Sequence, residues 1–454
     1  MSQAGHKSGN KAIMALLFVG VLMGALDLAI IGPALPAIQG EFGLDNRQLS
    51  WLFNVYVLAQ LPGTPLLAKM SDRFGRRDVY IGCVAAFAIG SLMLVIAGNF
   101  ETLVIGRGIQ GLGASGIFPV AAAVIGDSFP EDKRGGALGL IGAVFGLAFL
   151  IGPVLGGILL RYSWEWLFLI NLPIAVGLII AAWRLLPSVR SAQPLPFDWM
   201  GAFLLTAMLL SLAFGITNLD TLDVVASLMS DNVWPFLLSA AVFMPLFWQQ
   251  EQRAADPILR PSFFRSRRLR LILLIAAGVG TVESAQVFLP ALAVASLAVT
   301  ESVAAWLMLP AVFVMIIVSP LTGKLVDRSG PNRIVQGSLV FVFVGILAFG
   351  LATMTFGSFI GAGIVTGIGL AALLGAPLRY IILEEARPED RASAQGLLNV
   401  FLAIGQLGGA AIVGSVAASL GGGTVGYQWS YVVLAALSAV LIVASFGLKN
   451  KSAT

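Results

Sequence analysis

Three charged side chains lie within long apolar segments of this 454-residue sequence, namely Asp27, Arg107 and Glu283. Ionisable residues in hydrocarbon surroundings are costly, so by default they mark functional sites. The chemistry open to these residue types is the formation of ion pairs and the binding and release of protons. The single histidine lies in the polar N-terminal tail, and a single cysteine cannot form an intrachain disulfide. Without an HExxH or GxSxG motif, the sequence predicts neither an enzyme nor a metal site.

Asp27 and Arg107 are expected to lie at the same depth in a membrane. Asp27 lies ~22 Å along an apolar helix that begins near Ala12, and Arg107 lies ~8 Å along one that begins near Thr102 and runs the opposite way. In a hydrocarbon core about 30 Å thick these depths coincide, which predicts an ion pair. The alternative is a static buried salt bridge, since burial alone forces such charges to pair.

Glu283 lies in the second half of the chain, where the sequence shows no basic residue at a matching depth. A carboxyl group in that position is expected to exchange a proton. The alternative is a glutamic acid that stays protonated at all times. We predict that Asp27, Arg107 and Glu283 couple the protein to protons, which would be the coupling ion without any further cofactor.

The composition indicates an integral membrane protein, because 58% of the residues are hydrophobic and only 11% are charged. A membrane helix needs roughly 20 apolar residues. Most basic residues lie in segments on the same side of the membrane as the N-terminus, and only Arg47 and Arg161 lie on the opposite side. By the positive-inside rule, this places both termini in the cytoplasm of a multi-pass inner-membrane protein. Fourteen spans are predicted, beginning near Ala12, Leu49, Val79, Thr102, Gly136, Trp166, Trp199, Val233, Leu269, Val303, Ile334, Phe356, Gly396 and Tyr427.

Two loop motifs occur twice at nearly the same offset, which indicates a duplication. AKMSDRFGRR at 68–77 matches GKLVDRSGPNR at 323–333, and PEDKRGGALG at 130–139 matches PEDRASAQG at 388–396. The predicted fold is an all-α membrane protein with two six-helix bundles, 1–188 and 269–454. A linker at 189–268 adds two membrane helices and a basic cytoplasmic segment. Repeated halves suggest a transporter that rocks one bundle against the other around a central site.

The charged loops between spans could serve only as topological anchors. The duplicated aspartate favours a second role, because an anchor does not need an acid at fixed spacing from a glycine and arginines. Such an aspartate could cap a helix N-terminus or pair with an arginine of its own loop. At a wet boundary this contact contributes about 1 kcal/mol, which suits a latch that must open. The predicted latch residues are Asp72, Arg73, Gly75, Arg76, Arg77, Asp327, Arg328 and Gly330.

Glycines recur along the fifth predicted span with GxxxG spacing, at Gly142–Gly146 and Gly152–Gly156. Small residues at this spacing allow close helix packing in any membrane protein, and that is the simpler interpretation. The same face could also close a leak path where the span meets a partner, with Pro153 bending the helix.

The motifs resemble those of the major facilitator superfamily, and within it the fourteen-span drug–proton antiporters. Lys69–Arg77 fits the superfamily loop motif, with Ala68 in place of its first glycine, and Arg107–Gly111 fits R-x-x-Q-G. LDLAIIGPALPAI at 26–38 is similar to the antiporter motif of the first span, with Ala29, Ile31 and Gly32 as departures. Gly152–Gly157 fits G-P-x-x-G-G. The resemblance therefore implies an antiporter helix motif at Gly146, Gly152, Pro153, Gly156 and Gly157.

These features predict a proton-coupled antiporter that exports small lipophilic or cationic compounds by alternating access. A lipid or glycolipid flippase on the same scaffold is the nearest alternative, and a receptor without transport is another. We expect a monomer in the lipid bilayer, with a small-molecule or lipid substrate and no nucleic acid. Aromatic residues on helices more often pack than bind ligands. The candidates for lining the substrate cavity are Trp51, Tyr56, Gln60, Gln110, Phe288 and Trp306.

Overall fold

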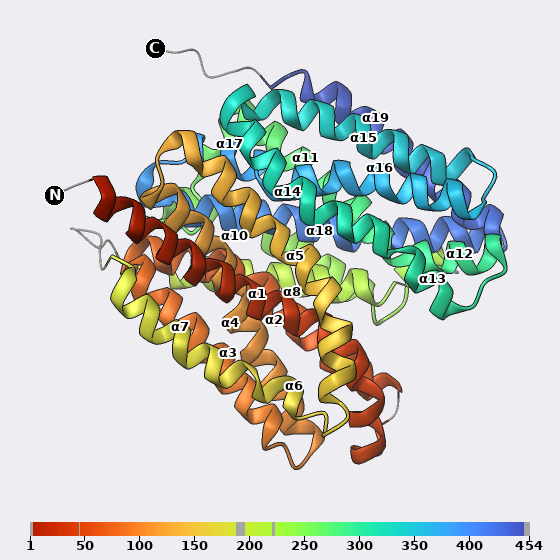
Figure 1. The fold of residues 1–454 in the computed structure, drawn as a ribbon, viewed down its shortest axis with the longest axis horizontal. Coiled ribbons are helices and arrows are strands. Elements are labelled where there is room, and N and C mark those ends of the chain that lie inside the picture. The colour runs from red at the N-terminus through yellow and green to blue at the C-terminus, as the bar shows by residue number, and fades with distance from the viewer. Residues whose placement is uncertain (1–2, 45, 188–195, 220–222, 449–454) are drawn as a thin grey trace. The chain divides into compact units, whose positions relative to one another are not determined.

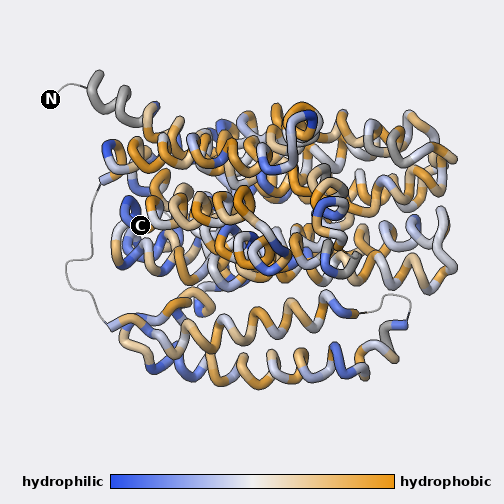
Figure 2. Tube along the Cα trace, turned by 90° about the horizontal axis from the view of Figure 1, so that it is seen from below, coloured by the Kyte–Doolittle hydropathy of each residue, from blue (hydrophilic) through white to orange (hydrophobic). Residues whose placement is uncertain are grey.

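A computed structural model describes residues 3–44, 46–187, 196–219 and 223–448, and every regular element in these ranges is an α-helix or a short 3-10 helix (Figure 1). The predicted all-α class is confirmed. Most helices are apolar along most of their length (Figure 2). The predicted domain boundary between 188 and 189 falls in 188–195, outside the described residues.

The helices of the first half follow one another with short connections. Their bounds are α1 (Gln3–Phe42), α2 (Asn46–Phe74), α3 (Arg76–Val95), α4 (Phe100–Ser128), α5 (Glu131–Leu159), α6 (Trp166–Leu169) and α7 (Asn171–Leu185). The middle of the chain forms α8 (Trp199–Thr217), α9 (Val224–Leu228), α10 (Trp234–Arg253) and η1 (Pro261–Phe264). The second half forms α11 (Arg267–Ser284), η2 (Ala285–Phe288), α12 (Leu289–Leu297), α13 (Glu301–Leu307), α14 (Leu309–Ser329), α15 (Pro331–Leu351), α16 (Phe356–Gly375), α17 (Pro377–Glu385), η3 (Pro388–Asp390), α18 (Arg391–Ser419) and α19 (Gly423–Ser445).

Twelve helical segments within the described residues are long and apolar enough to cross a membrane. The predicted spans near Leu49 and Val233 are also helical, as α2 and α10, over 29 and 20 residues. They fall outside the set of twelve because polar residues interrupt their apolar character. In α2 the polar residues Asn54 and Gln60 lie within the apolar stretch, and α10 ends in the sequence QQEQR.

The chain forms two compact units, and each contains a short segment from the other half of the sequence. The first unit comprises residues 1–131, 144–197 and 386–396, and the second comprises 132–143, 198–385 and 397–454. The start of α18 therefore belongs to the first unit, while the start of α5 belongs to the second. These two segments overlap the repeated PED motifs at 130–139 and 388–396, so the exchange is reciprocal.

Glycines bring helices of the first unit into backbone contact. A Cβ atom at Gly90 of α3 would lie 2.6 Å from both the Gln110 nitrogen and the Gly106 oxygen of α4. A Cβ at Gly113 of α4 would overlap the backbone of Phe87 on α3. Only glycine allows this approach. The approach places Ser91 of α3 directly beside Gln110 of α4.

Glycines do the same in the second unit, where α11 packs on α18. A Cβ atom at Gly280 of α11 would overlap the Leu402 carbonyl, and Cβ atoms at Gly405 and Gly409 of α18 would overlap carbonyls of Ala277 and Thr281. The two backbones are therefore as close as helices can come. This contact holds the C-terminal end of α11, which carries Glu283, against α18.

Candidate functional site

The ion pair predicted from sequence depth is present in the first unit. Nη1 of Arg107, on α4, donates to Oδ2 of Asp27, on α1, at 2.6 Å, and both side chains are fully buried. A buried pair of this kind is tolerated only when further hydrogen bonds satisfy both groups. The surrounding residues supply such bonds to Oδ1 of Asp27 and to Nε and Nη1 of Arg107, whereas the buried Nη2 of Arg107 has no hydrogen-bond partner among the described residues.

Gln110 bonds both members of the pair. Its amide oxygen accepts from Nη1 of Arg107 at 2.7 Å, and its Nε2 donates to Oδ1 of Asp27 at 2.7 Å. The same Nε2 lies 2.9 Å from Oγ of Ser91, which also accepts from Asn171 of α7 at 3.3 Å. The sequence predicted a cavity-lining role for Gln110, whereas the structure places it fully buried against the ion pair.

The other side of Arg107 faces α2. Its Nε donates to the Leu52 carbonyl at 3.0 Å, and its Cζ lies 4.3 Å from the ring centroid of Tyr56. This is a cation–π geometry, which is strongest where water is excluded. Tyr56, another predicted cavity residue, is also fully buried here. The pair, with Gln110, Ser91, Asn171 and Tyr56, forms one polar cluster between α1, α2, α3, α4 and α7, which we call the first-unit cluster.

Glu283 lies in a second polar cluster. Nε2 of Gln406, on α18, donates to Oε2 of Glu283 at 3.0 Å. Arg379, on α17, is buried, and its charge interacts with that of Glu283. The expectation that Glu283 lacks a basic partner is therefore wrong. Arg379 lies on α17 with its side chain buried, in a part of the chain where residue counting gave no basic residue at the depth of Glu283.

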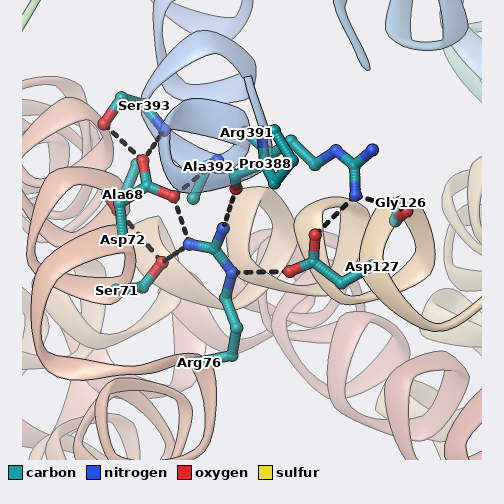
Figure 3. A network of polar contacts seen from close by, with 10 residues as sticks. All are labelled: Ala68, Ser71, Asp72, Arg76, Gly126, Asp127, Pro388, Arg391, Ala392 and Ser393. Carbon is teal, nitrogen blue, oxygen red and sulfur yellow. Dashed lines mark hydrogen bonds and ion pairs between the residues drawn. The ribbon is translucent and has the colours of Figure 1, made fainter. Parts of the chain in front are cut away.

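Figure 3 shows the contacts of Asp72, at the end of α2. Its Oδ1 accepts from the Ala392 nitrogen at 3.1 Å, and its Oδ2 accepts from the nitrogen and Oγ of Ser393 at 2.7 and 2.5 Å. Asp72 also pairs with Nη1 of Arg76. Both structural roles that the sequence left open are present, because Asp72 caps the first turn of α18 and pairs with an arginine of its own loop.

Arg76 extends this network to Asp127, and Asp127 extends it to Arg391; neither residue was predicted from the sequence. Nε of Arg76 pairs with Oδ2 of Asp127, at the end of α4, at 3.1 Å, and its Nη2 donates to the Pro388 carbonyl at 3.2 Å. Oδ1 of Asp127 in turn pairs with Nη1 of Arg391 at 2.7 Å. Arg391 and Ser393 both lie in the repeated PED motif, which is the sequence feature that could have identified them. Asp72, Arg76, Asp127, Arg391 and Ser393 are hereafter the Asp72 network.

The other predicted loop residues have separate positions. The guanidinium of Arg73 lies 5.2 Å from the ring of Phe74 and 5.9 Å from that of Phe197. Arg77 pairs with its neighbour Asp78 at 3.0 Å. Gly75 precedes α3 with φ of 101°, a conformation that favours glycine.

The second copy of the loop makes a simpler contact. Oδ1 and Oδ2 of Asp327, on α14, accept from the backbone nitrogens of Gly135 and Gly136, both at 2.8 Å. Asp327 therefore bonds to the second turn of α5, which begins at Glu131, whereas Asp72 bonds to the first turn of α18. Gly330 has φ of 80° and precedes α15, in the place that Gly75 has before α3. Arg328 is exposed.

The glycines of α5 pack closely, as the spacing predicts. A Cβ atom at Gly142 would lie 2.6 Å from Cα of Gly375 on α16, and one at Gly152 would lie 2.5 Å from Cβ of Ala29 on α1. Gly146 and Gly156 are buried, whereas Gly157 is exposed with open space beside it. The side chain of Pro153 lies outside the described residues.

The remaining cavity candidates differ in exposure. Trp51, Gln60 and Phe288 are partly buried, and Trp306 on α13 is 68% exposed. Among the described residues, no group of three or more His, Cys, Asp or Glu side chains could hold a metal ion.

Comparison with known proteins gives the family. The model of the Major Facilitator Superfamily matches residues 17–282 and 271–453. An uncharacterized MFS-type transporter of Bacillus subtilis strain 168, YfiU, is 34% identical over 88% of this chain and 78% of its own length. The multidrug transporter protein MdtP of the same strain is 30% identical over 92% of this chain and 77% of its own length.

A solved structure shows the same fold. The human organic anion transporter MFSD10 superimposes with a TM-score of 0.72 at 17% identity, covering 96% of this chain and 99% of that one. Neither named bacterial relative is described as moving lipids, so the flippase alternative gains no support from them. With its polytopic helical fold and a family match over most of its length, the chain belongs to the Major Facilitator Superfamily and is a transporter, not an enzyme.

Proposed function

We propose that this transporter is a proton-coupled antiporter that exports small lipophilic or cationic compounds by alternating access. The observation that carries the proposal is the fully buried pair of Asp27 and Arg107, held by Gln110. A charge pair without solvent contact is rare in a membrane helix unless it serves transport. The likeness to MdtP, which is described as a multidrug transporter, supports the substrate class.

Protonation of Asp27 would change the balance of contacts around Arg107. The neutral carboxyl group no longer attracts the guanidinium, yet Arg107 keeps its bonds to the amide oxygen of Gln110 and to the Leu52 carbonyl. The bonds that join α4 to α1 weaken, while those that join α4 to α2 remain. A proton can shift a conformational equilibrium only by such a difference between two states.

Protonation of Glu283 would act on the second unit in the same way, because it removes one charge of the interaction with Arg379. The contacts that Asp72 and Asp327 make would form in one state and open in another. Each contact holds the start of a long helix, α18 or α5, by backbone N–H groups.

The proposal extends to topology and assembly. We propose that α2 and α10 also cross the membrane, giving the fourteen spans of the drug–proton antiporters, with both termini in the cytoplasm and the protein in the inner membrane. Protons are the coupling ion and no other cofactor takes part. The protein works as a monomer with a small-molecule substrate.

The test is uptake into proteoliposomes under an imposed pH gradient, with quaternary ammonium compounds and neutral lipophilic drugs as substrates. Wild-type protein is expected to transport at least one of these only when the gradient is present, and Asp27→Asn is expected to abolish the dependence. Glu101→Gln, which changes an exposed carboxylate at the start of α4, is the matched control. Gradient-driven transport by Asp27→Asn at the wild-type rate would contradict the proposal.

A further inference from the structure

Two polar side chains on one face of α18 hold the two charged groups of the second unit. Asn399 accepts from Nη1 of Arg379 at 3.1 Å, and Gln406 donates to Glu283 at 3.0 Å. Asn399 and Gln406 are seven residues apart, which is about two helical turns and ~10 Å along the same face. α18 therefore separates a cation and a carboxyl group that interact electrostatically.

The carboxyl group has little freedom to approach the cation. The backbones of α11 and α18 touch at Gly280, Gly405 and Gly409. Glu283 lies one turn beyond Gly280, so moving its backbone would require opening this tight helix contact. Any adjustment between the two charges must come mainly from the long side chain of Arg379.

Arg379 also satisfies a carbonyl group at a break in its own span. α16 ends at Gly375 and α17 begins at Pro377, whose ring nitrogen cannot donate a hydrogen bond. Nε of Arg379 lies 3.4 Å from the Leu374 carbonyl, one of the groups left at the end of α16. Two of the acceptors of Arg379, Asn399 and Leu374, are therefore neutral groups.

The elements packed around Glu283 present few charges to it. α17 presents Arg379, and α18 presents the neutral amide of Gln406. From α19, the hydroxyl of Tyr431 donates to the Ala285 carbonyl at 2.9 Å, two residues from Glu283. Within the described part of the chain, Arg379 is the cation whose charge interacts with that of Glu283.

We infer that Arg379 is the movable counter-charge of Glu283, and that Asn399 holds it away while Glu283 carries a proton. When the proton leaves for water, the carboxylate attracts Arg379, which gives up its bonds to Asn399 and the Leu374 carbonyl. The protonation state of Glu283 is thereby transmitted to the break between α16 and α17 and to α18. This inference rests on the proposed function, because it names a residue whose position depends on the protonation state of the proposed proton site.

The experiment measures the protonation of Glu283 directly, by infrared titration of the protonated-carboxyl band in purified full-length protein. Glu283→Gln identifies the band by removing it. Arg379→Gln is expected to move the midpoint to higher pH by about one unit or more, since the carboxylate loses a nearby cation. Arg379→Lys keeps the positive charge on a shorter side chain, so it is expected to move the midpoint less.

Position 399 gives two shifts of opposite sign, which a merely structural role would not produce. Asn399→Asp adds a fixed carboxylate that retains Arg379 on α18, so the midpoint is expected to rise. Asn399→Ala releases Arg379 toward Glu283, so the midpoint is expected to fall. Gln336→Ala is the control, because it removes a side-chain hydrogen bond to the Ser445 carbonyl elsewhere in the same unit.

Unchanged midpoints in the Arg379 and Asn399 variants would overturn the inference, as would shifts of the same sign in both Asn399 variants. Thermal unfolding of each variant confirms that the protein titrated is folded. The proposed function fails by a different result, namely gradient-driven transport by Glu283→Gln and Asp27→Asn at the wild-type rate. The titration does not depend on transport, so the two failures are distinguishable.

Discussion

Asp72 and Asp327, 255 positions apart in sequence, make similar contacts at two places in the fold: each carboxylate accepts two consecutive backbone N–H groups near the start of a long helix, in the first turn of α18 for Asp72 and in the second turn of α5 for Asp327. A carboxylate at a helix N-terminus satisfies donors that have no partner within the helix and interacts favourably with the helix dipole. The two sites differ in their surroundings. Asp72 belongs to a network of charged side chains, whereas Asp327, within the described residues, is hydrogen-bonded to backbone amides alone.

Asp72→Asn is expected to slow transport while leaving membrane insertion and substrate binding intact. The amide keeps one acceptor oxygen but loses the charge that pairs with Arg76, at a cost of about 1–2 kcal/mol to the state with the cap formed. Turnover and binding are measured on the same reconstituted protein. Asp78→Asn, which removes a more exposed pair with Arg77, is the control. Equal turnover in Asp72→Asn and wild type would refute a role for the cap.

Gly152→Leu is expected to disrupt transport, because its Cβ atom alone would lie 2.5 Å from Cβ of Ala29 on α1. Overpacking of this kind costs about 1–3 kcal/mol and forces the helices apart. Gly157→Leu, five positions further along and in open space, should retain both stability and transport. Gly156 is buried, so Gly156→Leu should resemble Gly152→Leu. The comparison requires export assays and thermal unfolding, and loss of function in Gly157→Leu would show that packing is not the cause.

Asp27→Asn is expected to reduce stability as well as proton coupling. It leaves the fully buried Arg107 without its counter-charge, which costs about 3–5 kcal/mol when such a pair is broken. Glu283→Gln should remain well folded, because Arg379 keeps its bonds to Asn399 and Leu374. Thermal unfolding of both variants beside pH-gradient-driven counterflow makes the distinction. An equal loss of stability in the two would refute the structural importance of the ion pair.

Gln110→Ala is expected to cost about 1–3 kcal/mol, because Asp27 and Arg107 each lose a buried hydrogen-bond partner. Gln110→Glu is the sharper change: it keeps an acceptor for Arg107 but replaces the donor to Asp27 with a second carboxyl group. We expect Gln110→Glu to fold and to show an altered pH dependence of transport. A pH profile identical to wild type in both variants would remove Gln110 from the proposed coupling site.

Sequence analysis found the features that depend on residue type and spacing. The pairing of Asp27 with Arg107 followed from counting residues along two helices, because depth in a membrane is nearly linear in sequence. The contacts of Asp72 and Asp327 with helix starts followed from the duplicated loops. The GxxxG spacings identified the glycines at which α5 packs closely.

Contacts between distant segments could not be predicted in this way. Asp127 and Arg391 read as ordinary charges near helix ends, and only the fold shows that Arg76 lies against Asp127. Arg379 was not recognised as a partner of Glu283 because it lies in a short helix after a break at Gly375–Pro377, and a residue count along one continuous helix does not place it at the depth of Glu283. Gln110 was placed in a cavity because spacing alone does not reveal which face of α4 is turned toward α1.

The partners of Asp327 have a consequence for how the two halves can diverge. Backbone N–H groups are supplied by every residue except proline, so a substitution at Gly135 would keep the donor, but its Cβ atom would lie 2.5 Å from the Gly323 oxygen. The Asp72 network depends on the identities of four further side chains. The contact of Asp327 therefore constrains the size of the residues around it, and that of Asp72 constrains their chemical identity, so the two loops can diverge only under different restrictions.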